Sequence, residues 1–319
     1  MKLVVQIPCL NEEKTLPSVL KSIPKKIDGI DEIVLLIIDD GSKDKTVEVA
    51  RAHGVKEFVH HRRNQGLGRS FSDGVERALE LGADIVVNTD GDNQYPQDRI
   101  GDLVQPILAG KAEIVIADRQ TSKIAHFSPF KKFLQRLGSQ VVNVAAGTDV
   151  PDAVSGFRAY SKEALIQLNA ISRFSYCTET IIQAGNKRLA IASIPVETNP
   201  PTRKSRLFKS TWQHVYKTSA IIIRAYIMYK PQLVFGTLGS VLGVLGIIPI
   251  IRYIYFIAVD GSARGHLQSL IIGSIVLVAA FLCFVLIIIA DLIRINRILF
   301  ESQLEHTKRI RFGGTNNRP

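Results

Sequence analysis

Two long apolar stretches in the last third of the sequence constrain the fold more than any other feature. The first covers residues 231–251 without a charge, is interrupted by Arg252 and stays apolar to residue 259. The second covers residues 265–290, and its run SLIIGSIVLVAAFLCFVLIIIA has no polar face. Each exceeds the roughly 20 residues that a helix needs to cross a membrane. We therefore expect two membrane-spanning helices; two helices buried in a soluble bundle are the alternative.

Basic residues flank both stretches. Residues 203–230 contain seven Lys or Arg and no acid, and more follow the second stretch. Such flanks are typical of the cytoplasmic ends of spanning helices. Two spans with a short link place both chain ends on one side, so we expect a multi-pass protein of the cell (inner) membrane with cytoplasmic termini. The net charge of +11 could reflect nucleic acid, an anionic membrane surface or anionic substrates. Because the basic residues lie beside the apolar stretches, we expect no nucleic-acid partner.

The segment just before the first span mixes aromatic and apolar residues with basic ones. Residues 207–230 read LFKSTWQHVYKTSAIIIRAYIMYK. This composition predicts an amphipathic helix lying on the membrane surface; a linker helix packed on the soluble part is the alternative. The chain then divides into a soluble domain (1–206), an interfacial helix (207–230), a transmembrane hairpin (231–293) and a basic cytoplasmic tail (294–319).

The first 206 residues alternate between strand and helix patterns. Apolar, β-branched runs such as KLVVQIP, DEIVLLIIDD, KEFVHH, ADIVVNTD and AEIVIAD are separated by helix-like segments. This order predicts an α/β domain with a doubly wound, mainly parallel sheet. The three cysteines (Cys9, Cys177 and Cys283) lie far apart, which favours a reduced domain without disulfides or a thiolate metal site.

Polar clusters follow the predicted strands at their carboxyl ends. They read IPCLNEE, DDGSKDKT, HHRRNQGLGRS and TDGDNQYP. Ligands of doubly wound sheets bind outside the carboxyl ends of the strands. We therefore expect the four loops to converge on one crevice.

The individual clusters also allow simpler interpretations. Asn11 with Glu12, and Ser42 with Asp44, are suited to capping the helices that follow. The acidic cluster of Asp90, Asp92 and Gln94 is harder to explain in this way, because neighbouring carboxylates repel one another unless a cation lies between them. Oxygen ligands suit Mg²⁺ or Mn²⁺, whereas turn capping by the two acids remains the alternative.

Taken together, the motifs resemble the family 2 glycosyltransferases of the GT-A fold, and among them the polyprenyl-phosphate glycosyltransferases that include dolichol-phosphate mannose synthase. The resemblance rests on IPCLNEE, DDGSKDKT, NQGLGRSFSDG, TDGDNQYP and VSGFRAY, in this order over residues 1 to about 210. The two C-terminal spans and the basic segment NPPTRKSRLFKS resemble the bacterial members. TDGDNQYP departs from the commoner spelling, which has Ala or Leu where Gly91 and Asn93 stand, but it keeps the oxygen ligands.

The resemblance implies a role for particular residues. The metal would be held by Asp90, Asp92 and Gln94; the residues implied in catalysis are Asp92, Arg119 and Asp152. The substrate-binding residues implied are Pro8, Asn11, Glu12, Asp39, Asp40, Gly68, Arg158, Arg203 and Arg206. Among these, Asp39 and Asp40 match acids that hold the nucleoside, Arg119 and Arg158 match phosphate contacts, and Arg203 and Arg206 lie in the segment that would meet the lipid phosphate.

The resemblance also implies a reaction. It is the inverting transfer of a hexose from a UDP- or GDP-linked sugar to a polyprenyl phosphate at the cytoplasmic membrane face, with Mg²⁺ or Mn²⁺ as cofactor. A lipid monophosphate with a second pKa of about 6 is mostly deprotonated at neutral pH, so Asp152 is expected to orient groups rather than to be an obligatory base. Another lipid or glycan acceptor, or a non-catalytic nucleotide-binding scaffold, are the alternatives. Two lone spans commonly pack against copies of themselves, so a homo-oligomer is expected.

Overall fold

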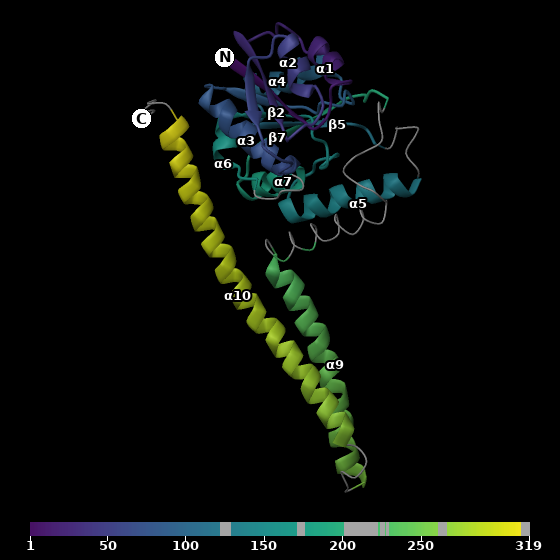
Figure 1. Cartoon of the computed structure of the whole chain (residues 1–319). Coiled ribbons are helices and arrows are strands. Elements are labelled where there is room, and N and C mark those ends of the chain that lie inside the picture. The colour runs from purple at the N-terminus through teal and green to yellow at the C-terminus, as the bar shows by residue number, and fades with distance from the viewer. Residues whose placement is uncertain are drawn as a thin grey trace. The chain divides into compact units, whose positions relative to one another are not determined.

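The structure is a computed structural model that describes residues 1–121, 129–170, 176–200, 223, 227, 230–260 and 267–313. The chain forms two compact units, one of Met1–Gln213 with Gln303–Pro319 and one of His214–Ser302 (Figure 1). Nearly all of the expected interfacial segment 207–230 lies outside the described residues, as do Arg203 and Arg206. Their proposed roles therefore stay predictions.

Strands and helices alternate through the first unit, as the sequence predicts. The strands are β1 (Lys2–Cys9), β2 (Glu32–Asp39), β3 (Glu57–His60), β4 (Ile85–Asn88), β5 (Ile114–Asp118), β6 (Arg158–Ser161) and β7 (Ile191–Pro195). The helices are α1 (Leu16–Ser22), α2 (Thr46–Ala52), α3 (Leu67–Glu80), η1 (Gln97–Arg99), α4 (Ile100–Leu108), α5 (Pro129–Ala146), α6 (Lys162–Gln167) and α7 (Cys177–Asn186). The apolar central strands are buried because helices pack on the sheet.

The strands form one seven-stranded sheet in the order β3-β2-β1-β4-β6-β5-β7. Every adjacent pair is parallel except those made by β6, which runs antiparallel to both β4 and β5. The expected α/β, mainly parallel sheet is thus confirmed. The antiparallel strand β6, which carries the end of the VSGFRAY motif, was not foreseen.

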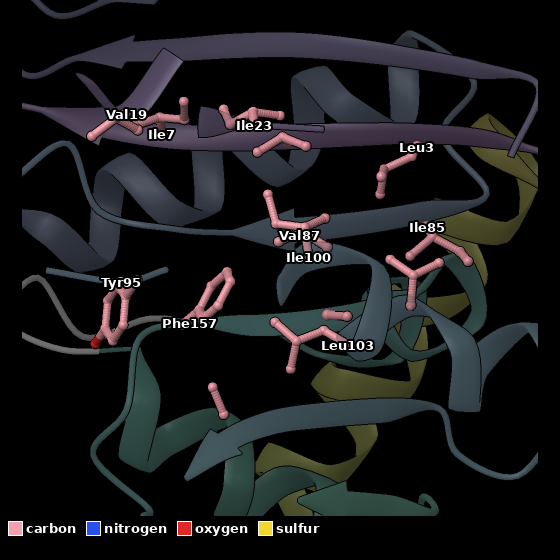
Figure 2. Close-up of a cluster of buried hydrophobic side chains, with 14 of the residues drawn as sticks. Leu3, Ile7, Val19, Ile23, Ile85, Val87, Tyr95, Ile100, Leu103 and Phe157 are labelled. Atoms are coloured by element: carbon pink, nitrogen blue, oxygen red, sulfur yellow. The ribbon is translucent and has the colours of Figure 1, made fainter. Parts of the chain in front are cut away.

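The core of the first unit lies between the sheet and the helices α1 and α4. Figure 2 shows Ile7 of β1 beside Val19 of α1, and Val87 of β4 beside Ile100 of α4, all of them buried. Apolar burial of this kind contributes about 25 cal/mol per Å². It fixes the strands whose ends carry the polar loops.

The direction of β6 decides which loops meet. Because β4 and β6 are antiparallel and Asn88 pairs with Arg158, the chain that leaves β4 lies beside the chain that enters β6. The loop with Asp90 and Asp92 is therefore adjacent to the loop with Asp152. Parallel β2, β1 and β4 bring their own following loops to this same edge.

The second unit contains the apolar helix α9 (Pro231–Asp260) and, up to Ser302, the apolar helix α10 (Leu267–Phe312). Both are long and apolar enough to cross a membrane, and only 11% and 17% of their most apolar windows are buried. They run alongside one another in Figure 1. Helix α10 continues to Phe312, so residues 294–312, which the sequence analysis assigned to the tail, are helical.

Candidate active site

The loops after β1 and β2 interlock. The backbone N–H of Asn11 donates to Ser42 Oγ at 2.9 Å, and the N–H of Lys43 donates back to Asn11 Oδ1 at 2.7 Å. The N–H of Glu12 donates to Thr46 Oγ1 at 2.8 Å. Asn11 has a left-handed φ of 56°, which its short polar side chain tolerates better than most. Asn11 thus joins two loops, and Thr15 rather than Asn11 occupies the N-cap position of α1.

The two acids at the end of β2 differ in what they contact. Asp40 Oδ1 accepts the N–H of Gln65 at 2.7 Å, and Asp40 Oδ2 accepts the N–H of Gly66 at 3.0 Å. Asp39 Oδ1 accepts the neighbouring amide of Ser42 at 2.9 Å, and Asp39 Oδ2 lies 3.5 Å from Nδ1 of the half-exposed His60. Asp40 therefore holds the loop after β3, and Asp39 is the better placed of the two to bind a ligand.

A histidine that the sequence analysis did not single out reinforces this loop. His61 is nearly buried, with Nδ1 2.7 Å from Asp40 Oδ1 and Nε2 3.0 Å from Asp73 Oδ2 on α3. A cavity of about 840 Å³ lies alongside, and its lining includes Arg62, Arg63 and Arg69. The predicted residue Gly68 is buried in the first turn of α3 and does not line this cavity.

The acidic loop after β4 carries the proposed metal ligands. Asp90, Asp92 and Gln94 are all partly exposed, and the amide of Gln94 donates to Asp92 through Nε2 at 2.9 Å. Within the described residues, no three His, Cys, Asp or Glu side chains form a group able to hold a metal ion. Asp90 and Asp92 offer carboxylate oxygens, and Mg²⁺ commonly takes one or two such ligands from protein while phosphate and water complete its shell.

Other contacts fix the shape of the acidic loop. Thr15 Oγ1 donates to the carbonyl of Gly91 at 2.8 Å. From beyond β7, the N–H of Asn199 donates to the carbonyl of Gln94 at 2.9 Å. Gly91 is needed here because an added Cβ would lie 2.9 Å from Cys9 Sγ. No sequence pattern indicated Thr15 or Asn199, because both act through distant backbone groups.

Arg119 and Asp152 form a buried, two-point ion pair. Arg119 Nε lies 2.6 Å from Asp152 Oδ2, and Arg119 Nη2 lies 2.9 Å from Asp152 Oδ1. The Asp152 side chain is 2% exposed and that of Arg119 is 18% exposed. Burial alone would raise the pKa of Asp152, but the charge and hydrogen bonds of Arg119 outweigh it and hold this pKa below its ordinary value. Asp152 is therefore ionised near neutral pH, where it orients Arg119 through both carboxylate oxygens.

Arg158 has a different environment from the one expected for a phosphate contact. It is fully buried, and its guanidinium donates to the carbonyls of Ser155, Cys177 and Ala153 at 2.7, 2.9 and 2.9 Å. Because these donors are already used inside the protein, Arg158 does not reach a ligand in this structure. Its contacts make it a support for the loop that carries Asp152.

The structure thus brings most of the predicted residues to one edge of the sheet. Pro8 at the end of β1 is partly buried and Glu12 is buried, and Thr15 Oγ1 joins the carboxylate of Glu12 at 2.9 Å. The same edge carries Asp39, the acidic loop and the Arg119–Asp152 pair. Strands β2 and β4 are both parallel to β1, and β4 and β5 are both antiparallel to β6, so β2, β4 and β5 all end at this edge.

Comparisons with known proteins agree with this arrangement. A family model described as glycosyl transferase family 2 matches residues 4–168. A Methanococcus voltae protein named UDP-N-acetylglucosamine–dolichyl-phosphate N-acetylglucosaminyltransferase is 32% identical over 213 residues, which cover 60% of this chain and 83% of that protein. An undecaprenyl-phosphate mannosyltransferase of Micrococcus luteus is 26% identical over 206 residues, covering 61% of this chain and 83% of that protein.

A solved structure resembles the fold as well. Glucosyl-3-phosphoglycerate synthase from Mycobacterium tuberculosis, in complex with Mn²⁺, UDP-glucose and phosphoglyceric acid, superposes with a TM-score of 0.53 at 26% identity. The match covers 71% of this chain and 78% of that chain. The family match spans more than half of the chain, and the sheet, the acidic loop and the relatives agree with it. The chain therefore belongs to glycosyl transferase family 2 and is a glycosyltransferase with the GT-A fold.

Proposed function

We propose that this glycosyltransferase moves a hexose from a UDP- or GDP-linked sugar to a polyprenyl phosphate, with inversion, at the cytoplasmic face of a membrane. The observation that carries the proposal is the meeting of three groups at one sheet edge. These are the acids of the loop after β4, the acid Asp39 and the buried Arg119–Asp152 pair. The two long apolar helices and the acceptors in the relatives' names support a lipid acceptor.

Asp90 and Asp92, with Gln94 beside them, would hold a divalent ion, Mg²⁺ or Mn²⁺. Such an ion supplies electrostatic stabilisation to the nucleoside diphosphate as it leaves. Gln94 keeps the Asp92 carboxylate in place through its amide, at 2.9 Å. Asp39, which is less engaged by backbone groups than Asp40, would bind the nucleoside.

Arg119 is the residue that we assign to a phosphate. Its Nε and Nη2 are held by Asp152, and Nη1 takes no part in that pair. The guanidinium is oriented in advance, which lowers the cost of fixing it when an anion binds. The acceptor phosphate, mostly deprotonated near neutral pH, attacks the anomeric carbon without needing a protein base. Asp152 therefore acts by positioning Arg119.

The cavity beside the loop after β3 supports binding of an anionic ligand on this side of the site. Three arginines and one acid, Asp73, contribute to its lining. A positive potential in a concave site raises the local concentration of anionic substrates. Both proposed substrates carry phosphate groups.

A donor screen tests the reaction. The full chain in native lipid extract is incubated with each radiolabelled UDP- or GDP-hexose and with Mg²⁺ or Mn²⁺. We expect label from one donor to enter an acid-labile polyprenyl-phosphate fraction. Label in a different lipid or in a glycan would replace the acceptor in this proposal, and no incorporation with any donor would reject the transfer itself.

Binding by calorimetry tests the metal ligands separately. Asp92→Ala is expected to abolish metal-dependent binding of UDP or GDP, because one of two carboxylate ligands is lost. Asp98→Ala is the matched control, since Asp98 is exposed on η1 a few residues away. Equal binding by the wild type and Asp92→Ala would contradict the metal site. Metal-dependent nucleotide binding without any transfer would favour the non-catalytic scaffold.

A further inference from the structure

The backbone of Gly156 in the VSGFRAY motif is held at both its N–H and its carbonyl by buried side chains. The N–H of Gly156 donates to the hydroxyl of Tyr95 at 3.0 Å. Its carbonyl accepts from the hydroxyl of Tyr176 at 3.0 Å and from Asn88 Nδ2 at 2.9 Å. The proposed reaction assigns no role to either tyrosine.

The surroundings of Gly156 leave its backbone little room to move. Tyr95 is 5% exposed and Tyr176 is fully buried. The ring of Tyr95 stacks on Phe157 with centroids 5.2 Å apart, and Figure 2 shows the two rings next to one another at the end of the core. A Cβ added to Gly156 would lie 3.1 Å from the Tyr176 hydroxyl and 3.6 Å from Asp90 Oδ2. Gly156 is therefore packed directly against the acidic loop.

Tyr95 belongs to the acidic loop itself. It directly follows Gln94 and lies three residues after Asp92. Gly156, in turn, lies four residues after Asp152 in the loop before β6. The Tyr95 hydroxyl thus joins the loop with the proposed metal ligands to the loop that orients Arg119.

The other supports of the Asp152 loop come from elsewhere. Ser139 Oγ on α5 accepts the N–H of Ala153 at 3.2 Å, and the guanidinium of Arg158 on β6 holds the carbonyls of Ala153 and Ser155. These contacts fix the loop to the body of the unit. They do not connect it to the part of the acidic loop that would change when a metal and a diphosphate bind.

We propose that the Tyr95 hydroxyl is a positioning group that couples occupation of the acidic loop to the placement of the Arg119–Asp152 pair. The inference rests on the proposed function, because it takes the acidic loop to be the metal and diphosphate site. When that loop is occupied, the rigid Tyr95 ring carries the movement to Gly156 and hence to Asp152. The arginine then meets the acceptor phosphate only when the donor is in place.

A purely local role for the hydroxyl, satisfying a buried N–H, makes a different prediction. Loss of that hydrogen bond would lower stability but would not separate donor binding from turnover. Coupling predicts that separation, because Tyr95→Phe keeps the ring and the stacking on Phe157 and removes only the link. The experiment must therefore read loop movement, donor affinity and turnover independently.

The test uses the full chain in detergent with a fluorophore on Val154→Cys. Val154 is 38% exposed in the Asp152 loop, and the native cysteines Cys9, Cys177 and Cys283 are buried, so labelling is selective. Mg²⁺ with UDP, and Mg²⁺ with GDP, are the probes. We expect the better-bound probe to change the fluorescence in the parent protein. In Tyr95→Phe this response is lost, donor affinity stays within about twofold, and turnover falls about tenfold.

Tyr176→Phe is the matched control. It makes the same chemical change, also at a buried ring, at the carbonyl of the same residue, Gly156, but from the residue just ahead of α7. We expect it to keep the fluorescence response. A response preserved in Tyr95→Phe, or lost equally in both variants, would overturn the coupling. Failure of the unlabelled wild type to bind either nucleotide would instead reject the proposed function, and the inference with it.

Discussion

At the scale of single residues, the Arg119–Asp152 pair sets the cost of burying two charges against their mutual attraction. Removing one partner of a buried pair leaves the other charge without compensation and typically costs 3–5 kcal/mol. Because Arg119 keeps 18% of its side-chain exposure, we expect Arg119→Ala to lie at the low end, about 3 kcal/mol. The measurement is the thermal unfolding of the first unit, followed in the full chain.

A second arginine supplies the control for this prediction. Arg77 pairs with Glu57 at 2.7 Å, and these side chains are 38% and 27% exposed. Ion pairs open to solvent contribute less than about 1 kcal/mol, so Arg77→Ala should cost that much or less. Equal losses of stability in Arg119→Ala and Arg77→Ala would show that burial of the Asp152 carboxylate does not dominate the cost of removing Arg119.

The lowered pKa of Asp152 also determines how its contribution to stability depends on pH. Since its folded-state pKa lies below the ordinary value of about 3.9, its contribution to stability is present above pH ~4 and is lost as the pH falls further. Asp152 therefore stays ionised between about pH 5 and 8. We expect the transfer rate to fall on the acid side with a midpoint near 6, the second pKa of the acceptor phosphate.

A variant tests whether Asp152 or the acceptor phosphate determines the acid side of the pH–rate profile. Asp152→Asn should lower the turnover number, because Arg119 loses its orientation, without moving the midpoint of the acid limb. The measurement is a pH–rate profile of both proteins at saturating donor. An acid limb that disappears or shifts in the variant would make Asp152 a proton acceptor after all.

At the scale of elements, the hairpin of α9 and α10 depends on glycines where the helices approach closely. A Cβ on Gly273 would lie 2.8 Å from the carbonyl oxygen of Gly246 and 2.7 Å from Ile250 Cγ1. Helices in lipid associate through close packing of this kind rather than through a hydrophobic driving force. Gly273→Leu should therefore separate the helices and destabilise the hairpin by about 1–3 kcal/mol, measured as a lower melting temperature in detergent.

Gly243 on the same helix as Gly246 provides the comparison. No heavy atom lies within 4 Å of a Cβ built there, so Gly243→Leu should leave the melting temperature nearly unchanged. If both substitutions have the same effect, helix propensity rather than helix–helix packing determines the result.

At the scale of the whole molecule, the arrangement of the two apolar helices predicts a membrane topology. Two spans return the chain to its starting side, and the basic flanks indicate that this side is the cytoplasm. The native cysteines are buried, which gives a low background for thiol labelling. We expect a membrane-impermeant maleimide, added outside intact cells, to label Asp260→Cys at the end of α9.

Cysteines at the two ends of the described chain complete the experiment. Lys2→Cys and Gly313→Cys should be labelled only after the membrane is opened, because both ends are predicted to be cytoplasmic. Labelling of either end in intact cells, or no outside labelling of Asp260→Cys, would contradict the two-span topology.

Much of the fold could be predicted from the sequence, because its signals are local. The apolar run of β2 and the polar DDGSKDKT that follows it identify a strand and its loop from neighbouring residues alone. The antiparallel strand β6 gave no comparable signal, since it has only four residues, begins with Arg158 and lies within the sheet between β4 and β5. Pairing between distant segments decided its place.

The roles of individual site residues were harder to predict from the sequence. Asp39 and Asp40 are adjacent in the sequence and look equivalent, yet Asp40 is occupied by the amides of Gln65 and Gly66. Arg158 resembles a phosphate ligand in its motif, yet it is buried among carbonyl groups. Hydrogen bonds over long sequence separations determine which polar side chains remain available, and no local pattern encodes them.

The sequence by itself determined the class of this protein: strand and helix periodicity, the order of the acidic and glycine-containing loops, and two apolar runs long enough to span a membrane. These follow from short-range chemistry, since backbone preference and hydrophobicity act along the chain. Only the tertiary structure decided that β6 runs antiparallel beside β4, which brings Gly156 to Tyr95 and Asp152 to the acidic loop. That arrangement depends on strand register and buried hydrogen bonds between distant segments, which exist only once the chain has folded.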